Sequence, residues 1–337
     1  MTVTVRSFAK INLGLRIGPA RADGFHELLT VYQTIGLHDI LRVSVARGTG
    51  IEIHCSDPRV PRDESNTCWR VAERVLQSLK AKGHVVIEIE KRLPLQGGLG
   101  GASANAVAIL LALERALRRP LPSAERLRIA AEVGSDLPLF LIGGTVLGVS
   151  RGEQVYPLPD LPPIPCVIVT PQIGVSTPKA FVEWDRLCGA GTPAREMPAR
   201  TTSQELTVST PSDRMNTLSR ELSAWLGEPY SGAPSSFTKG RGRAENPLLW
   251  LVRAGIENDF EKVVFPEYPE LGEAKRALVS AGAKYASLSG SGSTLYGLFA
   301  SRVVAAQAVK KLRKQGWTAQ ATVTLPRRAY WARIFDC

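Results

Sequence analysis

The strongest chemical signal in the sequence is a glycine-rich stretch, PLQGGLGGASANA, at residues 94–106. Four of the five residues at 97–101 are glycines, which leave the backbone free to adopt positive φ and to approach a ligand without a Cβ clash. The stretch runs into a predicted helix from about Ser103 to Leu117, whose first N–H groups and dipole favour an anion. We therefore predict a phosphate-binding loop; the alternative is a tight turn without a ligand.

Two common nucleotide-binding motifs are absent from the sequence. The chain has no Gly-Lys pair, so it contains no Walker A loop. The near match to a Rossmann fingerprint, GAGTPA at 189–194, precedes no helical pattern. A second glycine-rich element, SLSGSGST at 287–294, lies between two apolar runs. Alone it predicts only a turn, but together with 94–106 it suggests two backbone segments that converge on a polyphosphate.

Charged side chains that could act on such a ligand occur in two further motifs. In FAKINLGL, residues 8–15, Lys10 and Asn12 alternate with apolar residues, so one face of a strand would present an ammonium and an amide. In GSDLPLF, residues 134–140, Asp136 stands at the edge of an apolar segment, where it could serve as a base. The alternatives are a solvated lysine on a strand and an aspartate that caps a helix or turn.

The elements that must position these motifs can be predicted from periodicity. Strands are expected at 3–17 (ended by Gly18 and Pro19), 31–45, 51–55, 85–89, 144–149, 167–170, 285–289, 294–299 and 319–324. Helices are expected at 66–79, 103–117, 123–133, 247–254, 270–281 and 303–315. Strands come first and a mixture with helices follows, which favours an α+β fold over a regular βαβ alternation.

The length and the proline distribution indicate two domains. The stretch PLPDLPPIP at 157–165 is a plausible junction, so we predict an N-terminal domain over 1–160 and a C-terminal domain over 161–337. Within the second domain, residues 189–245 are rich in Gly, Pro, Ser and Thr and predict a flexible insertion. It would contain one short helix, Asp213–Leu226.

Bulk composition narrows the class of protein. Apolar residues make up 44% and charged residues 22%, as in soluble globular proteins, and no apolar run reaches the ~20 residues of a membrane helix. The N-terminus lacks the apolar stretch of a signal peptide, which predicts a cytoplasmic protein. The five cysteines and four histidines are dispersed without zinc-site spacing.

The net charge of +11 is concentrated toward the C-terminus, where residues 302–337 carry eight basic side chains against one Asp. This patch could be a solvated face, could attract anionic small molecules, or could bind nucleic acid. Few aromatic residues accompany it and no nucleic-acid-binding signature is visible, so nucleic acid is the least favoured of the three.

Taken together, the motifs resemble the GHMP kinase superfamily. They are AKINLGL, RADGFHEL, PLQGGLGGASANA, GSDLPLF and LSGSGST, and they occur in the order typical of that superfamily. The resemblance covers about 1–185 and 247–325, and the first two motifs resemble the branch that acts on a cytidine diphosphate-linked methylerythritol in the non-mevalonate isoprenoid pathway. It implies a two-domain fold with the active site in the cleft between the domains.

The resemblance also implies roles for individual residues. Asp136 would be the general base and Lys10 would support the acceptor hydroxyl electrostatically. The residues implied to bind ATP are Pro94, Leu95, Gln96, Gly97, Gly98, Leu99, Gly100, Gly101, Ala102, Ser103 and Ala104. The residues implied to bind the cytidine substrate are Asn12, Phe25, His26, Thr177 and Phe181.

Three positions depart from the family pattern. Phe25 stands where Tyr is common, Ala102 and Ala104 replace a Gly and a Ser of the loop, and Ser293 stands where Pro is frequent. Ser103 is then the loop's one hydroxyl for phosphate or metal.

The reaction implied is transfer of the γ-phosphoryl group of ATP, with Mg²⁺, to the 2-hydroxyl of the methylerythritol compound by a monomer or homodimer. No metal ligands can be identified from the sequence. The alternatives are another GHMP kinase, acting on homoserine, a mevalonate derivative or a sugar, and an inactive scaffold that binds nucleic acid through the basic C-terminal patch.

Overall fold

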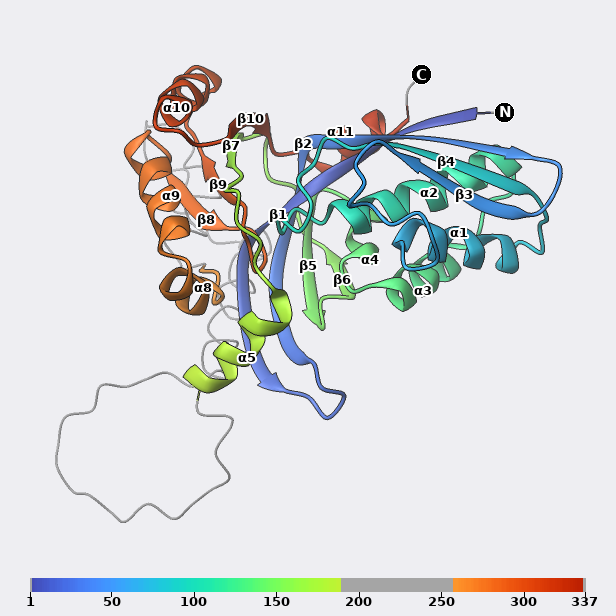
Figure 1. Cartoon of the computed structure of the whole chain (residues 1–337), viewed down its shortest axis with the longest axis horizontal. Helices are drawn as coiled ribbons and strands as arrows, with labels where there is room; N and C mark the ends of the chain where they lie inside the picture. Colours follow the sequence, from blue (N-terminus) through green and yellow to red (C-terminus); the bar gives the residue numbers. More distant parts are fainter. Residues whose placement is uncertain (1, 189–256, 336–337) are drawn as a thin grey trace, which may run out of the picture.

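The computed structural model describes residues 2–188 and 257–335, and within these ranges the strands form two sheets (Figure 1). The first sheet has the strand order β3-β4-β2-β5-β6, with β1 paired to β2. Its strands are β1 (Thr2–Ala20), β2 (His26–Ala46), β3 (Gly50–Cys55), β4 (His84–Glu90), β5 (Thr145–Ser150) and β6 (Gln154–Pro157). The second sheet has the order β10-β7-β9-β8. Its strands are β7 (Pro165–Val169), β8 (Tyr285–Leu288), β9 (Leu295–Leu298) and β10 (Ala319–Val323).

The described helices pack on these sheets in two groups. The helices beside the first sheet are α1 (Thr67–Ser78), α2 (Gly101–Leu117), α3 (Ser123–Val133) and α4 (Leu137–Phe140), with α11 (Arg327–Arg333) added by the end of the chain. Those beside the second sheet are α5 (Thr177–Leu187), α8 (Glu261–Glu267), α9 (Pro269–Ser280) and α10 (Arg302–Lys314). The mixture of a largely antiparallel sheet with segregated helices confirms the predicted α+β class.

A long hairpin of β1 and β2 connects the two halves (Figure 1). The body of the hairpin belongs to the first sheet, whereas Leu15, Ile17 and Leu28 near its tip pack into the core of the second half. The prediction that Gly18 and Pro19 end the first strand is wrong, because β1 continues to Ala20. The pairing register shifts between Ile17 and Ala20, and such an irregularity accommodates a proline that cannot donate to the ladder.

Three hydrophobic cores hold the molecule together. The first lies between the first sheet and α1 to α4, the second between the second sheet and its helices, and the third joins β1 and β2 to β7 and β9. Helix α2 lies deep in the first core. Its residues Ala104–Glu114 are all buried, more than the single apolar stripe that the sequence predicted. A helix that is apolar on all sides is expected to be enclosed by neighbours, here β1, β2 and α1.

Most predicted elements are confirmed with small shifts at their ends. Helix α3 matches its prediction, and α1 is capped by Asn66, whose side chain accepts the N–H of Cys68. Helix α2 begins at Gly101, inside the glycine-rich stretch. Sequence periodicity did not predict α4, α5, α8, α11 or β6, which are too short or too irregular to give a clear pattern.

The end of the described chain returns to the first sheet. Phe335 bridges to Val5, and the hydroxyl of Tyr330 donates to the carbonyl of Phe140 at 2.7 Å. The predicted boundary between 1–160 and 161–337 stays a prediction. The predicted helices at 213–226 and 247–254, and most of the predicted insertion at 189–245, lie outside the described residues. None of the helices described at 2–188 and 257–335 is long and apolar enough to cross a membrane.

Candidate active site

A cavity of about 590 Å³ lies between β1, the glycine-rich stretch and the first turns of α2 and α5. Every residue predicted from the sequence to be catalytic or to bind the substrate lines it: Lys10, Asn12, Phe25, His26, Asp136, Thr177 and Phe181. The predicted loop residues from Pro94 to Ser103 line it as well. Gly290 and Ser291 of the second glycine-rich element also line it, so the structure brings together motifs that are up to 281 residues apart in the chain (10 to 291).

Lys10, Asn12 and Asp136 form a connected group at the base of the cavity. The ammonium Nζ of Lys10 donates to Oδ1 of Asn12 at 2.7 Å, which confirms that the two side chains share one face of β1. The same Nζ lies 3.3 Å from Oδ2 of Asp136. Lys10 is only 3% exposed, so it is not the solvated lysine of the alternative interpretation. Asp136 precedes α4 but its side chain makes no capping hydrogen bond, so it is not the helix-capping aspartate of the alternative interpretation.

Tyr32 is a member of this group that the sequence did not reveal. Its hydroxyl donates to Oδ1 of Asp136 at 3.1 Å, and its ring lies 5.5 Å from Nζ of Lys10. Burial raises the pKa of Tyr32 well above its usual range, and the Asp136 carboxylate raises it further. The phenol therefore stays protonated and donates, which helps to orient the carboxylate. No sequence signal marked Tyr32, because it stands on β2 among ordinary strand residues.

The glycine-rich stretch forms a tight loop that ends in helix α2. Gly98 and Gly100 have φ values of 73° and 68°, in the left-handed region, and a Cβ on Gly100 would lie 3.1 Å from Cγ of Lys10. A side chain at Gly100 would thus fill the space beside the lysine. Helix geometry leaves the N–H groups of the first turn without partners inside the helix, and no side chain caps them. These groups, with the helix dipole, can bind an anion.

Ala104 is the predicted loop residue that does not line the cavity. Its N–H donates to the carbonyl of Gly100 at 2.8 Å, and its methyl group is buried in the first core. Ala104 therefore offers no free N–H to the cavity, and its predicted contact with ATP stays a prediction.

The second glycine-rich element contacts the first, as the sequence suggested. The hydroxyl of Ser289 donates to the carbonyl of Gly98 at 2.9 Å, and the N–H of Thr294 donates to the carbonyl of Gly97 at 3.2 Å. A Cβ on Gly98 would lie 2.0 Å from the carbonyl oxygen of Ser289, so the approach of the two backbones requires glycine. A Cβ on Gly290 would lie 3.6 Å from Nζ of Lys10, which places this second loop beside the Lys10 ammonium.

An aromatic region forms the other end of the cavity. The rings of His26 and Phe181 are stacked, with centroids 4.8 Å apart and an interplanar angle of 13°. Phe25 is 50% exposed, so it is not an ordinary core residue. The guanidinium of Arg151 lies 5.0 Å from the Phe25 ring. Thr177 shares a 2.7 Å hydrogen bond with Ser291, which joins α5 to the second glycine loop.

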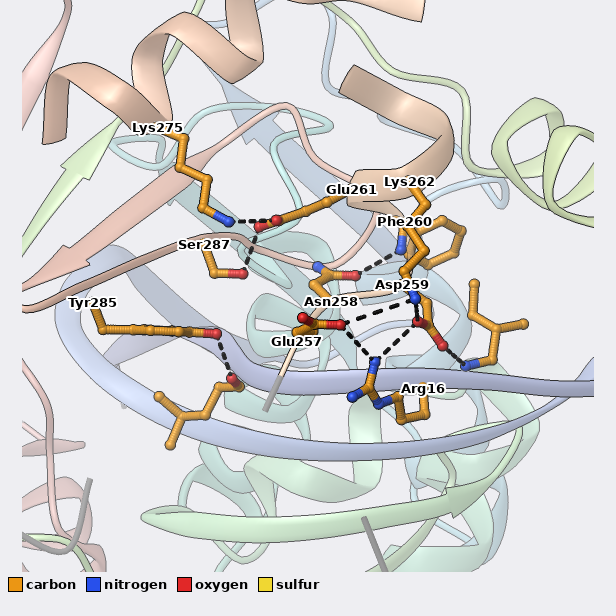
Figure 2. A network of polar contacts seen from close by, with 12 residues as sticks. Arg16, Glu257, Asn258, Asp259, Phe260, Glu261, Lys262, Lys275, Tyr285 and Ser287 are labelled. Atoms are coloured by element: carbon orange, nitrogen blue, oxygen red, sulfur yellow. Dashed lines mark hydrogen bonds and ion pairs between the residues drawn. The ribbon is translucent and has the colours of Figure 1, made fainter. Parts of the chain in front are cut away.

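A polar network fixes β1 against the second half of the molecule (Figure 2). The fully buried carboxylate of Asp259 accepts from Arg16 at 3.1 Å, from the N–H of Ile17 at 3.0 Å and from Lys262 at 3.0 Å. The amide of Asn258 donates to the carbonyl of Gly290 at 2.7 Å. The segment that carries these two residues thereby holds the strand of Lys10 and the second glycine loop in one fixed arrangement. No local sequence pattern predicted this network.

A second cation lies near the start of α2. Nζ of Lys91 donates to the fully buried carboxylate of Asp39 at 2.7 Å, and that carboxylate also accepts from Asn105 at 3.0 Å. Lys91 lines the cavity, and a Cβ on Gly101 would lie 3.4 Å from its Nζ. The lysine is thus held beside the anion-binding turn. Its position three residues before Pro94 is the signal that could have identified it.

No group of three or more His, Cys, Asp or Glu side chains that could hold a metal ion occurs among the described residues.

Comparison with known proteins agrees with this geometry. Residues 66–144 match the family described as "GHMP kinases N terminal domain", and residues 248–316 match "GHMP kinases C terminal". The chain is 36% identical over 333 residues to a 4-diphosphocytidyl-2-C-methyl-D-erythritol kinase of Solibacter usitatus (strain Ellin6076), covering 98% of this chain and 92% of that one. It is 34% identical to the protein of the same name from Acaryochloris marina (strain MBIC 11017), covering 89% and 87%.

Solved structures of other kinases superpose on this chain over nearly its whole length. A crystal structure of 4-(cytidine 5'-diphospho)-2C-methyl-D-erythritol kinase superposes with a TM-score of 0.68 at 26% identity, covering 95% of this chain and 98% of that one. Mevalonate kinase of L. major superposes with a TM-score of 0.65 at 16% identity, covering 96% of each chain, which shows a shared fold.

Proposed function

The chain belongs to the GHMP kinases, and on that premise we propose that it transfers the γ-phosphoryl group of ATP to the 2-hydroxyl of 4-diphosphocytidyl-2-C-methyl-D-erythritol. This is a step of the non-mevalonate route to isoprenoid precursors. The observation that carries the proposal is the Lys10–Asp136 pair, 3.3 Å apart, in the same cavity as the anion-binding loop. A cytoplasmic location is part of the proposal, since both substrates are charged and water-soluble.

Asp136 is the general base in this mechanism. Its carboxylate is part exposed to the cavity and is oriented by Tyr32, so it can accept the proton of the 2-hydroxyl as that oxygen attacks phosphorus. Lys10 stabilises the negative charge that develops during the transfer. The 2.7 Å contact with Asn12 holds the lysine in place before the substrate arrives. The bond from the γ-phosphorus to its bridging oxygen breaks, and ADP leaves.

The nucleotide phosphates bind at the glycine loop in this proposal. The uncapped first turn of α2 supplies N–H donors, and the left-handed Gly98 and Gly100 permit close approach of the backbone. Lys91, which is ion-paired with Asp39, has further N–H groups that can donate to the same polyanion. Phosphoryl transfer needs mainly such positioning and charge stabilisation.

Mg²⁺ is part of the proposal as a companion of ATP. It would be held mostly by phosphate oxygens, with the hydroxyl of Ser103 as the loop's contribution. When bound, the ion neutralises charge on the phosphates.

The cytidine half of the acceptor would occupy the aromatic end of the cavity. Phe25 and Phe181 offer flat faces for a base, and His26 offers a ring nitrogen for its edge. Stacking on an aromatic ring accepts any base, because every base has a flat face. Discrimination between bases must therefore come from the polar groups beside the rings.

The test is ADP release measured with the cytidine substrate and with 2-C-methyl-D-erythritol 4-phosphate, which lacks the cytidine. Homoserine, mevalonate and galactose serve as further acceptors. We expect turnover with the cytidine substrate and a loss of kcat/KM of at least a hundredfold without the cytidine, because binding energy from that remote part is lost. Faster ADP release with homoserine, mevalonate or galactose would refute the proposal.

A further inference from the structure

Asn258 joins the strand that carries Lys10 to the second glycine-rich loop. Its backbone forms a parallel bridge with Leu15, which lies on β1 as Lys10 does. Its side-chain Nδ2 donates to the carbonyl of Gly290 at 2.7 Å and to the carbonyl of Leu288 at 2.9 Å. Asn258 is only 1% exposed, and these two contacts use both hydrogens of its amide.

The contact with Gly290 sets the direction of one peptide group. The bond between Gly290 and Ser291 is trans, and in a trans peptide the C=O and the N–H point to opposite sides. The carbonyl is turned toward Asn258, which does not line the active-site cavity. The N–H of Ser291 is therefore turned away from Asn258. Gly290 and Ser291 both line the cavity, and no acceptor within residues 2–188 and 257–335 contacts this N–H.

The opposite orientation of this peptide would be harmful beside Lys10. Gly290 has a φ of 58° and no Cβ, so rotation about its backbone bonds meets little resistance. A Cβ on Gly290 would lie 3.6 Å from Nζ of Lys10, so this glycine is next to the ammonium. Of the three N–H donors of the ammonium, one is used by Asn12 and a second lies toward Asp136. A carbonyl turned toward Lys10 would occupy the third donor and would repel an anionic ligand.

We infer that Asn258 is a positioning residue for phosphoryl transfer, because it holds the Gly290–Ser291 peptide with its carbonyl away from Lys10 and its N–H toward the phosphoryl group. The N–H of Ser291 then adds a donor for the negative charge that develops beside the ammonium. Asn258 lies outside the cavity and acts through the peptide. This inference rests on the proposed function, since the transferred phosphoryl group is the ligand that the N–H would contact.

Glu261 provides a matched control from the same part of the chain (Figure 2). Its carboxylate is 14% exposed, lies outside the active-site cavity and pairs with Lys275 at 2.5 Å. It also accepts from the N–H of Leu288 at 2.9 Å, so it holds the end of β8 but makes no hydrogen bond to residues 289–292. Removing its charge weakens the polar network beside Asn258 and leaves the contact of Asn258 with the loop in place.

The experiment measures kcat, the KM for ATP and the KM for the cytidine substrate. The proteins are the full-length wild type, Asn258→Asp, Asn258→Ala and Glu261→Gln, assayed at a temperature at which circular dichroism shows all four to be folded. Both Asn258 variants lose the two N–H donors, and Asp conserves the size of the side chain. We expect kcat to fall by at least about tenfold in both, the effect of one lost donor to a charged group.

The pattern of kinetic constants separates positioning from a structural role. The KM for ATP should stay within about threefold of wild type in the Asn258 variants, because the first glycine loop binds most of the nucleotide phosphates. Glu261→Gln should keep kcat within about threefold. A kcat within about threefold in Asn258→Asp would overturn the inference, and so would an equal loss of kcat in Glu261→Gln.

The proposed function is tested separately by the wild type. Turnover of the cytidine substrate by the wild type leaves the proposed function standing, whatever the Asn258 variants do. A wild type without that turnover would refute the proposed function and the inference with it.

A second measurement does not depend on the stability of any Asn258 variant. Labelling wild-type protein with ¹³C-carbonyl glycine and ¹⁵N serine selects the three Gly-Ser pairs of the sequence, at 134–135, 290–291 and 292–293. The amide signal of Ser291 is assigned by its disappearance in Ser291→Ala. A non-hydrolysable ATP analogue added with the cytidine substrate should move the amide proton signal of Ser291 downfield, as a new hydrogen bond to an anion does. A signal that stays in place or moves upfield would overturn the inference.

Discussion

Replacing Asp136 with Asn removes the proposed base while conserving its shape. The structure predicts a small effect on folding. The carboxylate is 33% exposed, and a partly exposed ion pair contributes only ~0–1 kcal/mol to stability. The amide oxygen of Asn can still accept from Tyr32, and Lys10 keeps its 2.7 Å contact with Asn12. The melting temperature should therefore change by at most about 2–4 °C.

The effect on turnover should be much larger. A positioned general base contributes roughly 10²–10⁴-fold in rate, which corresponds to ~3–5 kcal/mol of activation free energy. We expect kcat for Asp136→Asn to fall by this factor while the KM for ATP changes little, since the nucleotide binds at the glycine loop. The assay is coupled ADP release with the cytidine substrate, and nucleotide affinity is checked separately by titration calorimetry.

Asp160→Asn is a suitable control for this variant. Asp160 is 27% exposed and lies 3.9 Å from Arg327, yet it is outside the cavity. The control should retain wild-type kcat. If Asp136→Asn kept kcat within about threefold of wild type, the assignment of the base would be refuted, whatever the stability of the variant.

Three further variants test the other parts of the site. Lys10→Ala should lower kcat more than it raises the KM for ATP, because the ammonium acts on the negative charge that develops in the transition state. A change in the KM alone would make Lys10 a binding residue. Phe25→Ala should raise the KM for the cytidine substrate by roughly 5- to 150-fold, because one stacking contact with the base is lost. Phe25→Tyr keeps the ring and should stay near wild type in both KM and melting temperature. Asp259→Ala should lower the free energy of unfolding, measured in urea, by about 3 kcal/mol or more. The reason is that the mostly buried guanidinium of Arg16 loses its fully buried partner. A loss below about 1 kcal/mol would contradict this reasoning.

The sequence by itself determined the chemistry that residues near one another in the chain can do. The glycines of 97–101 leading into an apolar helix predicted the loop and α2, because close approach and positive φ are local requirements of the backbone. The alternation of Lys10 and Asn12 predicted their shared face, because side chains on a strand repeat with period two.

Only the tertiary structure decided which distant groups complete the site. Tyr32 meets Asp136 because of the register of β2 with β1 and β5, and Asp185 meets His26 because α5 lies against the hairpin tip. Asn258 donates to the carbonyl of Gly290, which lies 32 residues further along the chain. Each of these contacts has one partner, Tyr32, Asp185 or Asn258, that stands outside the motifs recognised in the sequence. Pairing register and packing set them, and these depend on the whole chain rather than on any local stretch.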